Sequence, residues 1–122
     1  MVMKAVLLIS HGAYSSKSTQ EVADLTVQLK QLSGIDIFEY AFLEIESPDI
    51  AKGIDICIEK GATEVLVLLN FLNTGRHVAK DVPTIVKEAQ EKHPQVKISI
   101  SKPVGQHPKI KELFIDLINT SS

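Results

Sequence analysis

Short apolar runs alternate with segments of helical periodicity four times along the chain. The first and third runs are continuous in apolar residues, as expected for strands buried on both faces of a sheet. The last run alternates polar and apolar residues, which is typical of an edge strand with one more exposed face. We therefore predict strands over residues 4–10, 35–43, 64–69 and 96–101.

Capping and stop signals set the limits of the first two helices. Ser18, followed three residues later by Glu21, forms a capping box before apolar residues at helical spacing, and Gly34 ends that helix. The Ser-Pro pair at 47–48 supplies an N-cap and a first-turn proline for a second helix, which ends at Gly61.

A proline sets the expected start of the third helix. We predict that this helix begins near residues 81–83, where a proline suits the first turn, and ends before Pro94. The polar stretch 70–80 is accordingly interpreted as a loop. After a turn over 102–108, a fourth helix is predicted from the apolar spacing of residues 110–118.

Four strand–helix units with apolar strands predict an α/β fold in which helices cover both faces of a parallel sheet. Right-handed crossovers leave few arrangements, and the order 2-1-3-4 is the simplest doubly wound one. No internal repeat or linker divides the sequence. Residues 1–122 are therefore expected to form a single domain, a three-layer sandwich around a four-stranded sheet.

Composition narrows the functional classes. With 44% hydrophobic and 23% charged residues, the chain has the balance of an ordinary globular protein. Its formal net charge of −2 argues against a nucleic-acid binder, and no apolar run is long enough for a membrane span. The first apolar run is too short for a signal peptide, and Cys57 has no partner for an internal disulfide. We expect a cytoplasmic protein.

Three residues of metal-ligand type fall on the predicted ligand-binding edge of the sheet. Ligands of open parallel sheets bind outside the carboxyl ends of the strands. His11 follows the first strand, Glu44 ends the second, and His77 follows the third. Each has an ordinary explanation alone: a loop hydrogen bond, a polar strand end, or a solvated loop side chain. Their convergence on one edge favours a shared site, and Gly12 would let a flat ligand approach the backbone.

Two imidazoles and one carboxylate suit Fe²⁺, Co²⁺, Ni²⁺ or Zn²⁺ better than Mg²⁺ or Ca²⁺. Three protein ligands would leave coordination positions open, as a site that passes metal onward requires. The sequence has no HExxH, CxxC, GxGxxG or P-loop motif, so we expect neither a structural zinc site nor an organic cofactor. His93 is interpreted as a helix-end residue and His107 as a cap, neither of them catalytic.

Three sequence segments together resemble a known family. A strand ending in His11-Gly12, the segment FLEI at 42–45 and the segment GRHVAKDVP at 75–83 are similar to the class II tetrapyrrole chelatases. The similarity is greatest to the sirohydrochlorin chelatases of the CbiX and SirB types and covers essentially the whole chain. The chain departs from the family pattern at Ser10 and Ala13, and at Asn70 and Asn73 after the third strand.

The resemblance implies specific roles. His11 and His77 would bind the metal ion and accept protons from the pyrrole nitrogens, and Glu44 would complete the metal site. Substrate-binding residues would be Gly12, Tyr14, Arg76 and Lys80, with Lys17 and Lys102 as further basic groups and Phe71 and Leu72 as further apolar contacts. Tyr14, Phe71 and Leu72 are equally well explained as core residues. The family also implies a homodimer. The metal, Co²⁺, Fe²⁺ or Ni²⁺, would be a substrate for cobalamin, sirohaem or nickel-coenzyme synthesis.

Two other functional classes fit parts of the same pattern. The chain could be a carrier that binds a metal or a tetrapyrrole without catalysis, in which case binding would be stoichiometric. It could also be a small hydrolase with Ser10 or Ser15 as nucleophile beside His11, although the sequence lacks a nucleophile-elbow motif.

Overall fold

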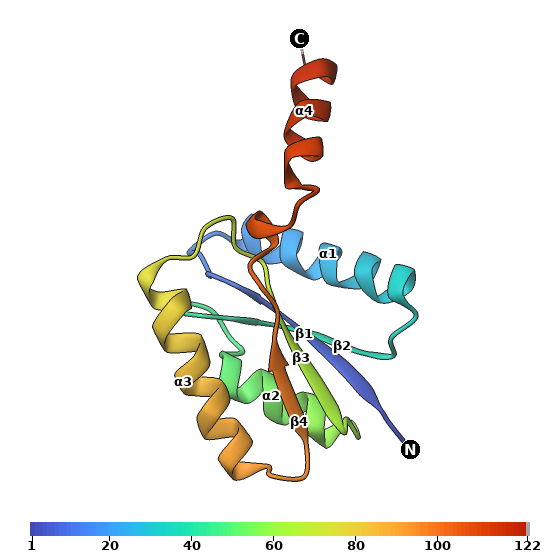
Figure 1. Cartoon of the computed structure of the whole chain (residues 1–122), viewed down its shortest axis with the longest axis vertical. Helices are drawn as coiled ribbons and strands as arrows, with labels where there is room; N and C mark the ends of the chain where they lie inside the picture. Colours follow the sequence, from blue (N-terminus) through green and yellow to red (C-terminus); the bar gives the residue numbers. More distant parts are fainter. Residues whose placement is uncertain (122) are drawn as a thin grey trace.

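The structure is a computed structural model that describes residues 1–121, with the side chain of His77 left out of the description. Nine elements follow one another along the chain (Figure 1). They are β1 (Lys4–Ser10), α1 (Ser16–Ser33), β2 (Ile37–Phe42), α2 (Ile50–Glu59), β3 (Glu64–Leu69), α3 (Arg76–Lys92), β4 (Lys97–Ile100), the short 3-10 helix η1 (Val104–Gln106) and α4 (Ile110–Thr120).

The four strands form one parallel sheet in the order β2-β1-β3-β4, which confirms the predicted topology. The chain turns to one side of β1 to make β2 and to the other side to make β3. The strand order therefore reverses at β1, and the carboxyl end of this strand lies at the switch point where ligands of such sheets bind.

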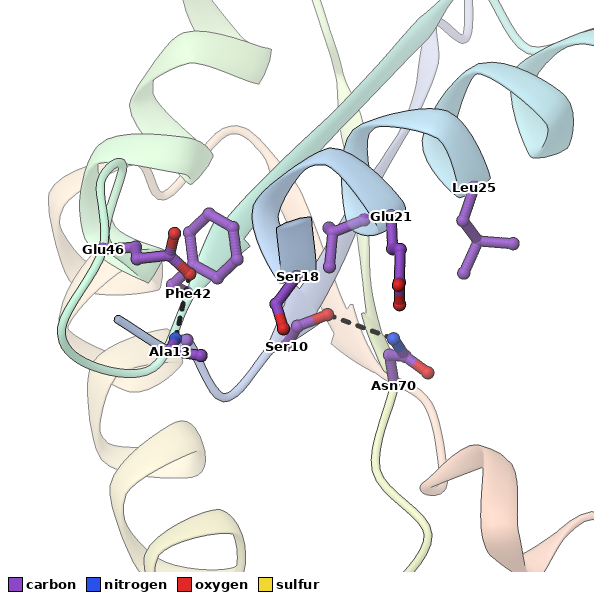
Figure 2. Close-up of a pocket in the computed structure, with 10 residues that line it drawn as sticks. Ser10, Ala13, Ser18, Glu21, Leu25, Phe42, Glu46 and Asn70 are labelled. Atoms are coloured by element: carbon purple, nitrogen blue, oxygen red, sulfur yellow. Dashed lines mark hydrogen bonds between the residues drawn. The ribbon is translucent and has the colours of Figure 1, made fainter. Parts of the chain in front are cut away.

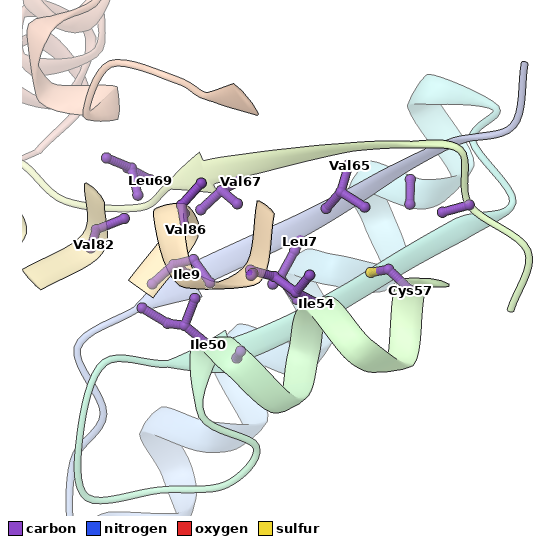
Figure 3. Close-up of a cluster of buried hydrophobic side chains, with 14 of the residues drawn as sticks. Leu7, Ile9, Ile50, Ile54, Cys57, Val65, Val67, Leu69, Val82 and Val86 are labelled. Atoms are coloured by element: carbon purple, nitrogen blue, oxygen red, sulfur yellow. The ribbon is translucent and has the colours of Figure 1, made fainter. Parts of the chain in front are cut away.

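Two apolar clusters hold the layers together. On the α2/α3 face of the sheet, the larger cluster packs Ile54 of α2 and Val82 of α3 against Leu7 and Val67 of the central strands (Figure 3). On the α1 face, a smaller cluster forms around Val6, Leu8 and Phe38, against which Val22, Leu25 and Leu29 of α1 pack. Helices thus cover both faces, as predicted, but the two faces are covered unequally.

The first two helices begin at residues other than those predicted. Ser15, not Ser18, is the N-cap of α1, and its hydroxyl accepts a hydrogen bond from the Ser18 amide at 3.5 Å. Asp49 caps α2 by accepting from the Lys52 amide at 2.8 Å, so the Ser-Pro pair at 47–48 belongs to the preceding loop. In both cases several neighbouring residues are good caps, and packing of the apolar face selects one of them.

The strands are also shorter than predicted at both edges of the sheet. Strand β2 covers 37–42 instead of 35–43, and β4 covers 97–100 instead of 96–101. An edge strand has a hydrogen-bonding partner on one side only, so its end residues leave the ladder more readily. The exposed character predicted for the last strand is confirmed, because β4 lies at the sheet edge with no fully buried side chain.

Helix α3 begins at Arg76, several residues before the predicted start at 81–83, and Pro83 lies inside it. A proline inside a helix removes one backbone hydrogen bond and normally disfavours the turn before it. Here Val78, one turn before the proline, and Val82, next to it, are buried in the larger cluster. Their packing outweighs the cost of placing a proline inside the helix. Arg76, His77 and Lys80 therefore lie in the first turns of a helix and not in a loop.

Helix α4 forms as predicted but covers neither face of the sheet. None of its residues is buried, and Figure 1 shows it projecting away from the body of the domain. Within the described residues, no helix combines the length and apolar content needed to cross a membrane.

The contribution of the larger cluster is measured by truncating Ile54, whose side chain is fully buried. Ile54→Ala should lower the free energy of unfolding by about 2–5 kcal/mol, because it removes apolar contacts and leaves a cavity. Leu32→Ala, at a side chain that is 85% exposed on α1, should change it by about 0.5 kcal/mol or less. Urea denaturation at one fixed protein concentration measures both; equal losses would contradict this description of the core.

Candidate functional site

The predicted ligand-binding edge is held together by hydrogen bonds that continue beyond the strands. The Leu43 amide donates to the Ser10 carbonyl oxygen at 2.9 Å, and the Glu44 amide donates to the His11 carbonyl oxygen at 3.1 Å. The pairing of β1 with β2 thus extends by two residues past the last strand positions. It places the backbones of His11 and Glu44 side by side, as the sequence predicted for this edge.

Gly12 permits this arrangement. Its φ is +97°, a conformation that residues with a Cβ rarely adopt. A Cβ added at Gly12 would lie 2.0 Å from the carbonyl oxygen of Glu44. The space that a side chain would fill is therefore taken by the end of β2, so a glycine is required by packing within the chain.

The loop after Glu44 is tied to the loop after His11. Ile45 has a φ of 73°, which is strained for a β-branched residue, and the Glu46 amide donates back to the Glu44 carbonyl oxygen at 2.8 Å. The Glu46 carboxylate in turn accepts from the Ala13 amide at 3.0 Å (Figure 2). This sharp turn leaves Glu44 exposed and directs Glu46 back to the first loop.

The imidazole of His11 rests on a buried aromatic ring. The rings of His11 and Phe71 meet edge to face, with centroids 4.4 Å apart and an interplanar angle of 78°. Phe71 is 3% exposed, so it belongs to the core, and the His11 ring packs against it from the exposed side. The sequence left Phe71 open as a contact for a macrocycle or as a core residue; its burial shows that it is a core residue, and it positions His11. Tyr14 and Leu72 are 95% and 58% exposed and remain available for contact.

A second contact, which the sequence did not reveal, joins the ends of β1 and β3. The side-chain amide of Asn70 donates to the Ser10 hydroxyl at 3.1 Å (Figure 2). The backbone amide of Asn70 donates to the Ile9 carbonyl oxygen at 2.9 Å. Ser10 is buried, and Ser15 caps α1. Both hydroxyls thus have structural partners, which disfavours a serine hydrolase built on either of them.

Two hollows lie near this edge of the sheet. One, of about 340 Å³, lies on the α1 face and is lined by Gly12 and by the carboxylates Glu21 and Glu46 (Figure 2). The other, of about 330 Å³, lies between the end of β2 and α3, and its lining includes Glu44 and Lys80. The lining of the first hollow holds two carboxylates and no basic side chain, whereas that of the second combines the carboxylates Glu44 and Asp81 with Lys80.

The start of α3 supplies the remaining predicted site residues. Arg76 and Lys80 are exposed in its first turns. The side chain of His77, the residue after Arg76, lies outside the described residues. Among the side chains that are described, no group of three or more His, Cys, Asp or Glu residues is gathered as metal ligands. The ligand set of His11, Glu44 and His77 therefore stays a prediction.

The other two histidines lie away from this edge. His93 caps the far end of α3, where its Nε2 lies 3.1 Å from Oδ1 of Asp55. Burial by itself would raise the pKa of Asp55, but hydrogen bonds from His93 and Lys92 lower it overall. His107 precedes α4, and its Nδ1 accepts from the Lys109 amide at 3.0 Å. His93 thus has the helix-end role expected from the sequence, whereas the N-cap of α4 is Lys109, and His107 instead ends η1.

The CbiX family model matches residues 5–121. The chain belongs to the CbiX family. Its sequence is 30% identical, over 98% of its length, to the sirohydrochlorin ferrochelatase of Priestia megaterium, of which it covers 45%. It is 29% identical, over 92% of its length, to the sirohydrochlorin cobaltochelatase of Sulfolobus acidocaldarius, of which it covers 87%.

This CbiX-family chain is also similar to a solved chelatase structure. The sirohydrochlorin chelatase SirB of Bacillus subtilis subspecies spizizenii, in complex with cobalt, superposes with a TM-score of 0.87 at 28% identity. The superposition covers 97% of the present chain and 50% of SirB. The chain thus spans about half the length of several relatives that it matches, while the Sulfolobus protein is of nearly its own length. The predicted fold and family resemblance are both confirmed.

The requirement for Gly12 is tested by comparison with Gly34. Both have positive φ, but a Cβ at Gly34 would meet nothing within 4 Å. Gly34→Ala should lower the free energy of unfolding by about 1–2 kcal/mol, because the alanine is strained in this backbone conformation. Gly12→Ala should lower the free energy of unfolding by about 1–3 kcal/mol more than Gly34→Ala does, because the Glu44 backbone must also move. Urea denaturation measures the difference; equal losses would contradict the close approach of the two loops.

Proposed function

We propose that this CbiX-family chain is a sirohydrochlorin chelatase, a lyase that inserts a divalent metal ion into the tetrapyrrole. Its full-length match to a cobaltochelatase of nearly the same size carries the proposal. That relative shows that a chain of about this length bears the chelatase name without a second unit in the same polypeptide. The metal ion is a substrate here, and no organic cofactor is required.

Metal insertion needs groups that hold the ion and groups that accept the two pyrrole protons. In the proposed mechanism His11 and His77 hold the metal over the macrocycle face, and Glu44 provides a third ligand. A neutral imidazole is both a ligand for such metals and a proton acceptor near neutral pH. The exposed position of His11 on Phe71, beside the backbone of Glu44, supports this assignment.

The positions of the basic side chains favour one side of the edge for the substrate. Sirohydrochlorin is a polycarboxylate, so Glu21 and Glu46 would repel it from the hollow on the α1 face. The other hollow also has two carboxylates, Glu44 and Asp81, but it is lined by Lys80 as well, and Arg76 is exposed one turn earlier in α3. We propose that Lys80 and Arg76 hold substrate carboxylates, while Tyr14 contacts the macrocycle.

The family resemblance also leads us to propose a homodimer that acts in the cytoplasm. Cobalt and iron both remain candidate metals, because relatives are named for each of them. Nickel is a third candidate, since the same ligand types accept it.

The activity is tested by mixing the protein with sirohydrochlorin and Co²⁺, Fe²⁺ or Ni²⁺ without oxygen and following the absorption change. We expect multiple turnovers and a rate above that of uncatalysed insertion for at least one metal. Stoichiometric binding without acceleration would instead identify a carrier and contradict the proposal.

Substitution of the two histidines tests their roles. His11→Ala and His77→Ala should each lower the insertion rate by about 10²-fold or more, because each removes a ligand that is also a proton acceptor. His107→Ala is the matched control, since its imidazole serves only the turn before α4. Circular dichroism would verify that all three variants are folded. Wild-type turnover by His77→Ala would show that the assignment is wrong.

A further inference from the structure

A strained three-residue turn directly follows the candidate ligand Glu44. The Glu46 amide donates to the Glu44 carbonyl oxygen at 2.8 Å, and Ile45 between them has a φ of 73°. A turn closed in this way around a positive φ is the rare form of the γ-turn, and a β-branched residue is poorly suited to it. Such a conformation persists only when the surrounding contacts hold it in place. The contacts of this turn are therefore the contacts that fix the backbone of Glu44.

The loop that contains the turn is closed at its base by backbone hydrogen bonds. The Phe42 amide donates to the Pro48 carbonyl oxygen at 2.9 Å, so residues 43–48 form a short closed loop. At the start of this loop, the Glu44 amide is bonded to the His11 carbonyl oxygen at 3.1 Å. These bonds fix where the loop begins and ends, but they do not hold its tip at Ile45 and Glu46.

The Glu46 carboxylate supplies the contact at the tip of the loop. Its Oε2 accepts a hydrogen bond from the Ala13 amide at 3.0 Å (Figure 2). Ala13 lies two residues after His11, and Glu46 lies two residues after Glu44. One partly buried hydrogen bond between residues 33 positions apart thus joins the loops that carry both of these exposed side chains.

Glu21 provides a comparison, because it brings a second carboxylate to the same hollow on the α1 face. Within residues 1–121, the Glu21 carboxylate has no hydrogen bond or ion pair, whereas that of Glu46 is bonded to the backbone of the first loop. The two carboxylates therefore share a location and a charge but differ in their attachment to the candidate site.

We propose that Glu46 is a positioning residue, which acts through the Ala13 amide to hold Glu44 and His11 at the separation that a shared metal ion requires. Its carboxylate serves the protein backbone and contacts neither the metal ion nor the tetrapyrrole. The inference rests on the proposed function, because it takes His11 and Glu44 as metal ligands. Groups that orient metal ligands in this way commonly set the affinity for the metal.

The substitution Glu46→Gln separates the hydrogen bond from the charge, because the glutamine carbonyl oxygen can still accept from the Ala13 amide. Glu46→Ala should weaken Co²⁺ binding about tenfold, as is typical when a residue that orients metal ligands is lost. Glu46→Gln should bind nearly as tightly as the wild type. Glu21→Ala is the matched control, since it removes a carboxylate from the same hollow but no bond to the loop, and it should also bind Co²⁺ normally. The visible absorption of Co²⁺ measures all four affinities.

Amide hydrogen exchange tests the hydrogen bond itself. The Ala13 amide should exchange faster in Glu46→Ala than in the wild type, Glu46→Gln or Glu21→Ala, and circular dichroism would verify that all four proteins are folded. Co²⁺ binding by Glu46→Ala as tight as that of the wild type would overturn the proposal. So would a loss in Glu46→Gln as large as that in Glu46→Ala, because the charge and not the bond would then matter.

These measurements use no tetrapyrrole, so they distinguish the positioning role from the proposed activity. A wild type that binds Co²⁺ with the expected order of variants, but does not accelerate insertion, would contradict the chelatase assignment and support the role of Glu46. A wild type that binds no Co²⁺ would overturn both.

Discussion

The close approach of Gly12 to the Glu44 carbonyl oxygen is the constraint on which the candidate site depends. It lets the hydrogen bonding of β1 with β2 continue past the strand ends, so that the backbone of His11 is paired with that of Glu44. The central strand β1 is fixed on its other side by Asn70, which bonds to Ser10 and to the Ile9 backbone. The loop that carries His11 is thus held by both neighbouring strands, and its imidazole can be exposed and still positioned.

The residues that support the candidate site differ from those proposed to react. Phe71 and Ser10 are buried and hold the edge, while His11 and Glu44 are exposed beside them. The two sides of the edge differ in their basic groups, because Lys80 lines the hollow beside α3 together with Glu44 and Asp81, whereas no basic side chain lines the hollow on the α1 face. Such preorganisation by packed and hydrogen-bonded neighbours is what a site needs to hold reacting groups within a narrow range of positions. In the proposed chelatase the substrate would meet the side that carries Lys80 and Arg76.

The sequence predicted the sheet order, the helix layers and the edge at which His11 and Glu44 meet, because these follow from apolar periodicity and from strand topology. It misplaced the start of α3, since Pro83 is a strong local signal and the burial of Val78 and Val82 that outweighs it is a tertiary effect. The contact between Asn70 and Ser10 could not be predicted, because it joins residues sixty positions apart. Nor could periodicity show that α4 leaves its own sheet uncovered.

The most direct test of the central claim is the identity of the imidazoles that respond to metal. Histidine-selective NMR spectra recorded during titration with paramagnetic Co²⁺ would resolve the four side chains, each assigned by single substitution. We expect the resonances of His11 and His77 to shift or broaden first, while those of His93 and His107 stay in place. Early perturbation of His93 or His107, with His11 unaffected, would contradict this expectation.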